Sequence, residues 1–112
     1  MIELQAPKTR ITAEQIAQAV ALLVEAARPE QIVLFGSHAR GDARDDSDLD
    51  LLVVERVLFN KAQEMVRLRR ALRPLGISAD VLVTTPEELA SLGREKGSVY
   101  WWVLREGRVL HG

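Results

Sequence analysis

Two short apolar runs joined by a charged loop decide the fold, and they lie between residues 31 and 54, QIVLFGSHARGDARDDSDLDLLVV. The first run, Gln31–Phe35, is β-branched and aromatic and predicts a strand that stops at Gly36. The second run, Leu49–Val54, is apolar at consecutive positions, which indicates a strand covered on both faces and therefore central in its sheet. The polar residues 37–47 predict a loop, with room for one helical turn.

Helices are expected on either side of this stretch. Thr12 and Gln15 form a capping-box pattern that predicts the start of a helix. Pro29 predicts its end, because the residue before a proline avoids helical geometry. The segment Leu58–Leu75 has apolar residues at helical spacing and predicts a second long helix, which Gly76 stops.

The C-terminal third predicts four more elements. They are a strand at Ala79–Val83, a helix opening at Thr85-Pro86 with Glu88 closing a capping box, a short helix at Val99–Leu104, and an edge strand at Arg108–His111. The composition of Val99–Leu104 also allows a strand, but Ser98 as a cap and Gly107 as a stop favour the helix. The alternation predicts an α/β (α+β) fold, a small mixed β-sheet flanked by helices, in one domain over residues 1–112.

Bulk composition excludes several kinds of site. The chain has 112 residues, of which 47% are hydrophobic, so a core is expected without covalent cross-links. The absence of cysteine excludes disulfides and thiolate metal sites. The net charge of -1 argues neither for nor against nucleic acid, and no apolar stretch is long enough to span a bilayer. We expect a cytoplasmic protein without a membrane partner and without direct nucleic-acid binding.

Asp48 and Asp50 stand where the second apolar run begins, and they are candidate catalytic residues and metal ligands. Residues i and i+2 of a strand point to the same face, roughly 6–7 Å apart, and two carboxylates that close repel each other unless a cation lies between them. Magnesium prefers such oxygens, with phosphate oxygens completing its shell. Asp80 opens the next predicted strand, so it faces the same ions if the two strands are neighbours. Three carboxylates can hold two ions, which clamp the attacking and leaving oxygens of an in-line displacement.

Gly36 and Ser37 supply the candidate nucleotide-binding half of the site. Gly36 ends a strand and allows a close backbone approach, and the backbone N–H groups of such a turn, with the Ser37 hydroxyl, can hold phosphate oxygens. Arg40 and Arg44 follow closely and can neutralise triphosphate charge. Acidic residues that can pair with either arginine lie nearby, at Asp42, Asp45 and Asp46. For Arg44 we expect a structural role and not a functional one.

The stretch from Gly36 to Val53, GSHARGDARDDSDLDLLV, resembles the signature of the DNA polymerase beta-like nucleotidyltransferase superfamily, in its minimal, stand-alone branch. The order of elements and Asp80 fit the same resemblance. It implies transfer of AMP from ATP to a hydroxyl, with two Mg²⁺ ions held by Asp48 and Asp50. By the same resemblance, Asp80 binds the catalytic metal and helps to activate the acceptor, while Ser37 and its neighbours hold the β and γ phosphates. His38 stands where Arg or Tyr is also common and is given no role.

The resemblance also implies a partner. Minimal members are commonly encoded beside a small helical protein of the HEPN family, a ribonuclease toxin, and several act as its antitoxin by adenylylating a toxin tyrosine. We therefore expect a hetero-oligomer in which this chain is the antitoxin. Two alternatives stay open: a binding module that masks its partner stoichiometrically, and nucleotidyl transfer to a small molecule. A chain this short also favours an acceptor supplied by another protein.

Two further groups of residues carry both a structural and a functional interpretation. The first is the basic run Arg67, Arg69, Arg70, Arg73, which is either a solvated helix face or a patch for an acidic partner. The second is Tyr100, Trp101, Trp102. Consecutive residues of a helix cannot all face one core, so at least one ring is expected at the surface, where self-association or a partner interface is the alternative to core packing.

Overall fold

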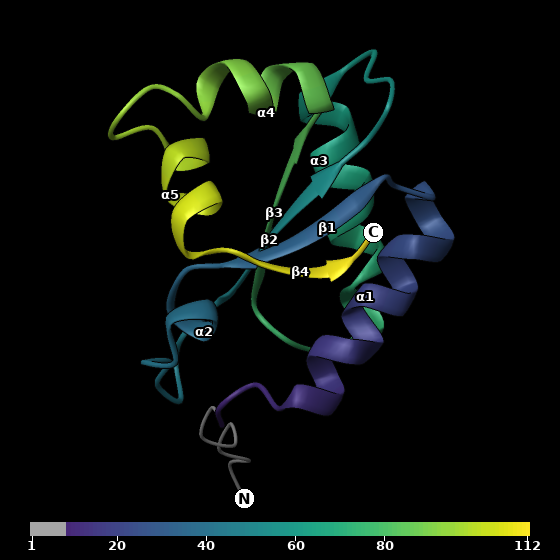
Figure 1. Cartoon of the computed structure of the whole chain (residues 1–112). Helices are drawn as coiled ribbons and strands as arrows, with labels where there is room; N and C mark the ends of the chain where they lie inside the picture. Colours follow the sequence, from purple (N-terminus) through teal and green to yellow (C-terminus); the bar gives the residue numbers. More distant parts are fainter. Residues whose placement is uncertain (1–8) are drawn as a thin grey trace, which may run out of the picture.

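A computed structural model describes residues 9–112, and at its centre lies a mixed four-stranded sheet (Figure 1). The strands are β1 (Gln31–Phe35), β2 (Leu49–Val54), β3 (Ala79–Thr84) and β4 (Arg108–His111), in the order β3-β2-β1-β4. β2 runs antiparallel to β1 and parallel to β3, and β4 adds an antiparallel edge beside β1. The predicted central place of the second run and the predicted C-terminal edge strand are both confirmed.

Helices cover both faces of this sheet. They are α1 (Ala13–Ala27), α2 (Ser37–Arg40), α3 (Lys61–Ala71) with a 3₁₀ turn, η1 (Arg73–Leu75), then α4 (Pro86–Leu92) and α5 (Val99–Glu106). α1 and α3 pack together on one face, whereas α4 and α5 lie against the other, and α2 sits at the end of β1 (Figure 1). The mixed sheet flanked by helices is the fold class that the sequence predicts.

The alternation of side chains along β2 builds two cores. Leu51 and Val53 belong to the larger core, which also contains Leu23 of α1. Leu52 and Val54 point the other way, into the smaller core beneath α4 and α5. Because both faces of β2 are covered, its last four residues are all buried, as the uninterrupted apolar run predicts.

Local capping explains where the helices begin, and it corrects two predictions. The Thr12–Gln15 capping box is present in both directions, so the start of α1 is confirmed. The second long helix begins at Lys61 and not at Leu58, because the Asn60 side chain accepts a hydrogen bond from the Gln63 amide and so fixes the first turn. Residues 55–60 are consequently a loop.

The second correction concerns Glu88. Thr85 caps α4 by accepting a hydrogen bond from the Glu88 amide, at 3.2 Å. The Glu88 carboxylate does not close a capping box with Thr85, because it accepts a hydrogen bond from the Thr84 hydroxyl and pairs with Lys61 of α3. The short helix Val99–Leu104 is confirmed, extends to Glu106, and is capped by the Ser98 hydroxyl.

Across residues 9–112, no helix has both the length and the apolarity needed to cross a membrane.

Candidate active site

Asp50 and Asp80 lie side by side at the sheet end where β2 and β3 begin. The parallel register pairs Asp50 with Asp80, and the Leu49 amide donates a hydrogen bond to the Ser78 carbonyl at 2.9 Å. Neighbouring strands lie about 4.8 Å apart, so the two carboxylates rise from adjacent backbones on one face. Asp48 precedes β2 by one residue and is exposed. The expectation that the third strand neighbours the second is confirmed.

The protonation of Asp50 reflects this crowding. Partial burial raises the pKa of Asp50, and the charges of Asp80 and Asp48 raise it further. The positive charges of His38 and Arg40 act in the opposite direction and lower it. The pKa of Asp50 remains above its usual value, so the two cationic side chains do not offset burial and the neighbouring carboxylates.

Gly36 brings the backbone of the β1–α2 turn directly against Asp50. The β1–β2 register pairs Phe35 with Asp50, which places Gly36 beside the carboxylate. A Cβ at Gly36 would collide with Asp50 Oδ2 and would lie 3.1 Å from Asp50 Cγ. The Gly36 φ of 74° with ψ of -155° is also a backbone conformation that is essentially restricted to glycine. Both the space and the dihedral angles therefore require glycine here.

Ser37 opens α2 immediately after this turn. The Gly36 carbonyl accepts hydrogen bonds from the Ala39 and Arg40 amides, both at 3.1 Å. The single turn of α2 therefore holds Ser37, His38 and Arg40 at the end of β1, next to Asp50. The predicted loop with one helical turn is confirmed.

Arg40 is held by two acidic side chains, one of which comes from the far end of the chain. Its Nε lies 3.3 Å from Asp42 Oδ2, and its Nη1 lies 3.1 Å from Glu106 Oε1 at the end of α5. The pairing of Arg40 with Asp42 was one of the alternatives that the sequence left open. Glu106 was not predicted, because it lies 66 residues away and has no sequence signal of its own.

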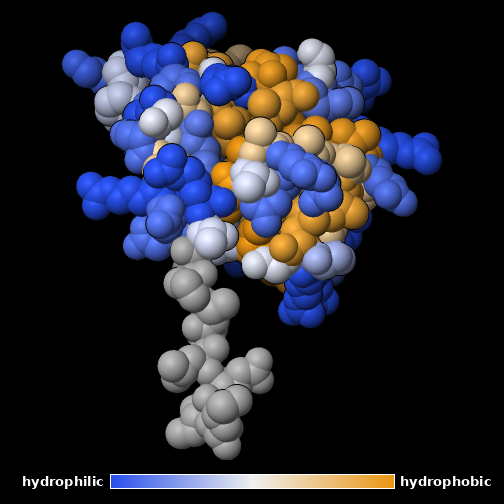
Figure 2. All heavy atoms as spheres, turned by 90° about the horizontal axis from the view of Figure 1, so that it is seen from below, coloured by the Kyte–Doolittle hydropathy of each residue, from blue (hydrophilic) through white to orange (hydrophobic). Residues whose placement is uncertain are grey.

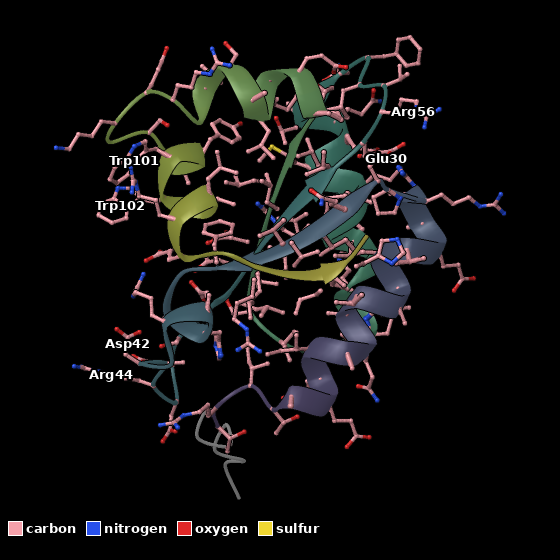
Figure 3. The ribbon with its side chains drawn as sticks, viewed as in Figure 1. Glu30, Asp42, Arg44, Arg56, Trp101 and Trp102 are labelled. Atoms are coloured by element: carbon pink, nitrogen blue, oxygen red, sulfur yellow. The ribbon has the colours of Figure 1, made fainter. Side chains whose placement is uncertain are left out.

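Arg44 and His38 belong to the loop that carries the chain from α2 to β2. The Arg44 amide donates to the Ser47 hydroxyl at 2.7 Å, which forms the turn before Asp48. Within residues 9–112, the Arg44 side chain makes no ion pair, and Figure 3 shows it with Asp42 on the outer side of this loop. His38 Nε2 lies 3.4 Å from the Ser47 carbonyl and ties α2 to the same turn.

Arg69 of α3 is a second residue that sequence reasoning missed. Its Nη2 lies 4.0 Å from Asp80 Oδ1, and both side chains are more than half exposed. The sequence placed Arg69 only within a basic run. Helix periodicity alone does not show which arginine of the run reaches β3. Asp80 therefore has a cation on its outer side and Asp50 on its inner side.

Asp50 and Asp80 are adjacent, and Asp48 lies two residues before Asp50, but the three aspartates do not form a closed cage. Among the residues that the structure describes, no three Asp, Glu or His side chains converge enough to enclose a metal ion by themselves. The site is open, and Asp50 is the carboxylate that faces the Gly36 backbone.

Comparison with known proteins places this geometry in a family. A family model for the nucleotidyltransferase domain matches residues 13–101. A protein of Methanocaldococcus jannaschii, provisionally named a protein adenylyltransferase, is 37% identical over 84 residues, which span 75% of this chain and 80% of the relative. A solved structure described provisionally as a minimal nucleotidyltransferase is 34% identical, with a TM-score of 0.59, over 85% of this chain and 91% of its own.

Two more distant structures share the fold. A provisionally assigned nucleotidyltransferase from Sulfolobus solfataricus is 22% identical, with a TM-score of 0.60, over 86% of this chain and 76% of its own. A chain in a toxin–antitoxin crystal structure with AMP-PNP is 20% identical, with a TM-score of 0.60, over 85% of this chain and 72% of its own.

Proposed function

The chain belongs to the nucleotidyltransferase domain family and is a nucleotidyltransferase enzyme, and on that premise we propose that it transfers AMP from ATP to a tyrosine hydroxyl of a partner protein. The observation that carries the proposal is the placement of Asp50 between Asp80 and the Gly36 backbone. This arrangement sets carboxylates beside the Gly36-Ser37 turn, whose backbone N–H groups can bind phosphate oxygens.

The donor half of the site is assigned to the β1–α2 turn. Gly36 and Ser37 would hold phosphate oxygens of ATP through the backbone and the hydroxyl, because no side chain intervenes at Gly36. Arg40 stands one helical turn further on and would neutralise phosphate charge. Its two acidic partners fix where its guanidinium is presented.

The residues present fit magnesium. Asp48, Asp50 and Asp80 offer only carboxylate oxygens, and the raised pKa of Asp50, which burial causes first and the two neighbouring carboxylates increase, marks negative charge that a cation would relieve. When bound, Mg²⁺ would neutralise charge that develops on the transferring phosphoryl group. The role of the chain would be to hold these carboxylates close together, and the parallel β2–β3 register, which pairs Asp50 with Asp80, supports this role.

The acceptor half is assigned to the β3 side of the site. β3 is an edge strand and the Asp80 side chain is 61% exposed, so a hydroxyl from another molecule can approach it directly. Asp80 would accept the proton of that hydroxyl as it attacks the α-phosphorus, while pyrophosphate leaves.

A protein acceptor and a toxin–antitoxin setting are supported by the relatives. One relative is named for protein adenylylation, and one structural neighbour is part of a toxin–antitoxin complex with AMP-PNP. We therefore propose that the chain is the antitoxin of such a pair. Its partner would be the small HEPN-family helical protein that the sequence resemblance implies.

The exposed face of α5 supports a second candidate function, stoichiometric masking of the partner. Trp102 is 50% exposed and Val99, three residues earlier on the same helix face, is 40% exposed. Figure 3 shows Trp101 and Trp102 together on the outer side of α5. Masking by this face would not need the aspartates.

One experiment separates the two functions. The protein is incubated with ATP labelled at the α-phosphate, magnesium and the purified product of the adjacent gene, and the product is analysed for a tyrosine that carries AMP. We expect labelling by the wild type and by the control Asp45→Asn, and loss of labelling with Asp48→Asn. Equal labelling by Asp48→Asn and the wild type would contradict the catalytic proposal, whereas an Asp48→Asn variant that no longer labels the partner but still neutralises it would support masking as the way in which the partner is inhibited.

A further inference from the structure

Two hollows run end to end along α3, outside the candidate active site. The first, of about 500 Å³, lies between α3 and the β2–α3 loop, and the second, of about 480 Å³, lies between α3 and the start of β3. Val66 and Arg70 line both, so the two hollows share a wall on α3. We call the two neighbouring hollows together the α3 groove, with Phe59 in the first hollow, Ala79 in the second, and Val66 and Arg70 in both.

The α3 groove has exposed apolar side chains along its first hollow. Phe59 is 99% exposed, Val57 57% and Val66 47%, and all three line the first hollow. Covering a fully exposed phenylalanine with a partner is favourable, because apolar surface is removed from water. Phe59 has no such cover from the rest of residues 9–112. This end of the groove is therefore suited to an apolar side chain of another molecule.

The rim of the α3 groove is positively charged. Arg67 is neutralised by Glu64 and also donates to the Ala26 carbonyl at 2.9 Å. Within residues 9–112, neither Arg70 nor Arg73 has an acidic group within 4.0 Å, and both line the groove. A partner that complements this rim therefore carries acidic side chains.

The second hollow of the α3 groove reaches the edge strand β3 beside Asp80. This hollow is lined by Ala79, which precedes Asp80 in β3, and by Arg69, whose guanidinium reaches Asp80 at 4.0 Å. A chain lying in the groove would therefore lead toward the carboxylate assigned to the acceptor hydroxyl.

We propose that the α3 groove binds an acidic segment of the acceptor protein that carries apolar side chains, and that it guides the acceptor hydroxyl to Asp80. This inference rests on the proposed function. Exposed Phe59, Val57 and Val66 favour a polypeptide over a nucleic acid, because a phosphate backbone would use the arginines and leave these apolar side chains exposed.

A binding measurement tests the groove without requiring catalysis. The probe is a fluorescein-labelled synthetic peptide of alternating Glu and Leu with one central Tyr, and binding is followed by fluorescence anisotropy. We expect Val66→Asp and Arg70→Glu each to weaken binding about tenfold or more, since each removes a contact and adds repulsion. The matched controls Val109→Asp and Arg94→Glu make the same changes at exposed positions outside the groove and should bind as the wild type does.

Several results would overturn the inference. The first is that the wild-type protein does not bind the peptide, and the second is that the control variants weaken peptide binding equally. The third is that the protein prefers a single-stranded RNA oligonucleotide, and that Arg70→Glu abolishes this RNA binding while Val66→Asp leaves it intact. Self-association of the chain through the groove, followed by sedimentation at rising protein concentration, would also contradict the inference.

Kinetics separate failure of this inference from failure of the proposed function. With the adjacent gene product as acceptor, Val66→Asp and Arg70→Glu should raise the KM for the acceptor about tenfold and change the KM for ATP less than about twofold. Peptide binding that depends on Val66 and Arg70, without any AMP transfer by the wild type, would retain the docking surface and reject the proposed reaction.

Discussion

Gly36 lies against the carboxylate of Asp50 so closely that no other residue type fits between them. A Cβ at Gly36 would collide with Asp50 Oδ2, and the positive φ of 74° adds backbone strain for any side chain. This contact joins the turn assigned to phosphate with the row of carboxylates assigned to magnesium, and it comes from the antiparallel pairing of Phe35 with Asp50.

Gly36→Ala should therefore displace Asp50 and abolish activity. We expect a loss of about a hundredfold or more in kcat/KM, because misplacing a reacting group by about 1 Å has that effect. Stability should fall by about 1–3 kcal/mol from backbone strain. Gly41→Ala is the matched control: Gly41 also has a positive φ, of 84°, but nothing lies within 4 Å of its added Cβ. Equal loss of activity in the two variants would contradict the importance of the Gly36–Asp50 contact.

The pairing of Arg40 with Glu106 predicts that the end of α5 influences ATP binding. Arg40→Gln should raise the KM for ATP about tenfold, because a charge-assisted contact to phosphate is lost. Glu106→Gln should raise the KM for ATP less, because it frees the Arg40 guanidinium, which Glu106 now holds at 3.1 Å. The two substitutions should not be additive, since Glu106 acts through Arg40. Steady-state kinetics of the double variant checks this, and fully additive effects would count against the assignment.

Glu55 predicts how stability depends on pH. Its side chain is 8% exposed and its Oε2 lacks a hydrogen-bond partner among the described residues. Burial, and then the neighbouring Glu64 carboxylate, raise the pKa of Glu55 from 4.5 to about 7, against the opposing charge of Arg67. The folded protein therefore binds a proton that the unfolded chain releases between these pH values, so stability falls as pH rises through that window.

Glu55→Gln should remove this dependence. The glutamine variant should be more stable than the wild type above about pH 7, by on the order of 2 kcal/mol, and should approach it near about pH 4.5. Chemical denaturation at several pH values measures the difference. A constant difference across the range would contradict the assignment of the proton to Glu55.

Much of the fold follows from local sequence signals, whereas the finer geometry of the site does not. The uninterrupted apolar run Leu49–Val54 predicted a central strand, and the Thr12 cap predicted the start of α1; both are confirmed. The start of the second helix was misplaced because the apolar spacing extends back to Leu58, while the Asn60 cap decides where the helix begins.

The partners of the site residues depend on contacts between distant segments. Asp80 was expected near Asp50 only if their strands paired, and periodicity cannot decide pairing or register. Glu106 and Arg69 carry no motif, and only the packing of α5 and α3 brings them to Arg40 and Asp80. The α3 groove likewise arises from two segments that are separate in the sequence.

The most direct test of the central claim measures magnesium-dependent release of pyrophosphate from ATP, with the adjacent gene product as acceptor, for the wild type, Asp50→Asn and Asp45→Asn. Asp45 is an exposed aspartate of the same loop and controls for loss of charge. We predict that Asp50→Asn lowers the rate by about a thousandfold or more, because a carboxylate that would hold the cation on the reacting phosphate is lost, while Asp45→Asn keeps the wild-type rate. Equal rates for the wild type and Asp50→Asn would contradict the claim that these carboxylates carry the reaction.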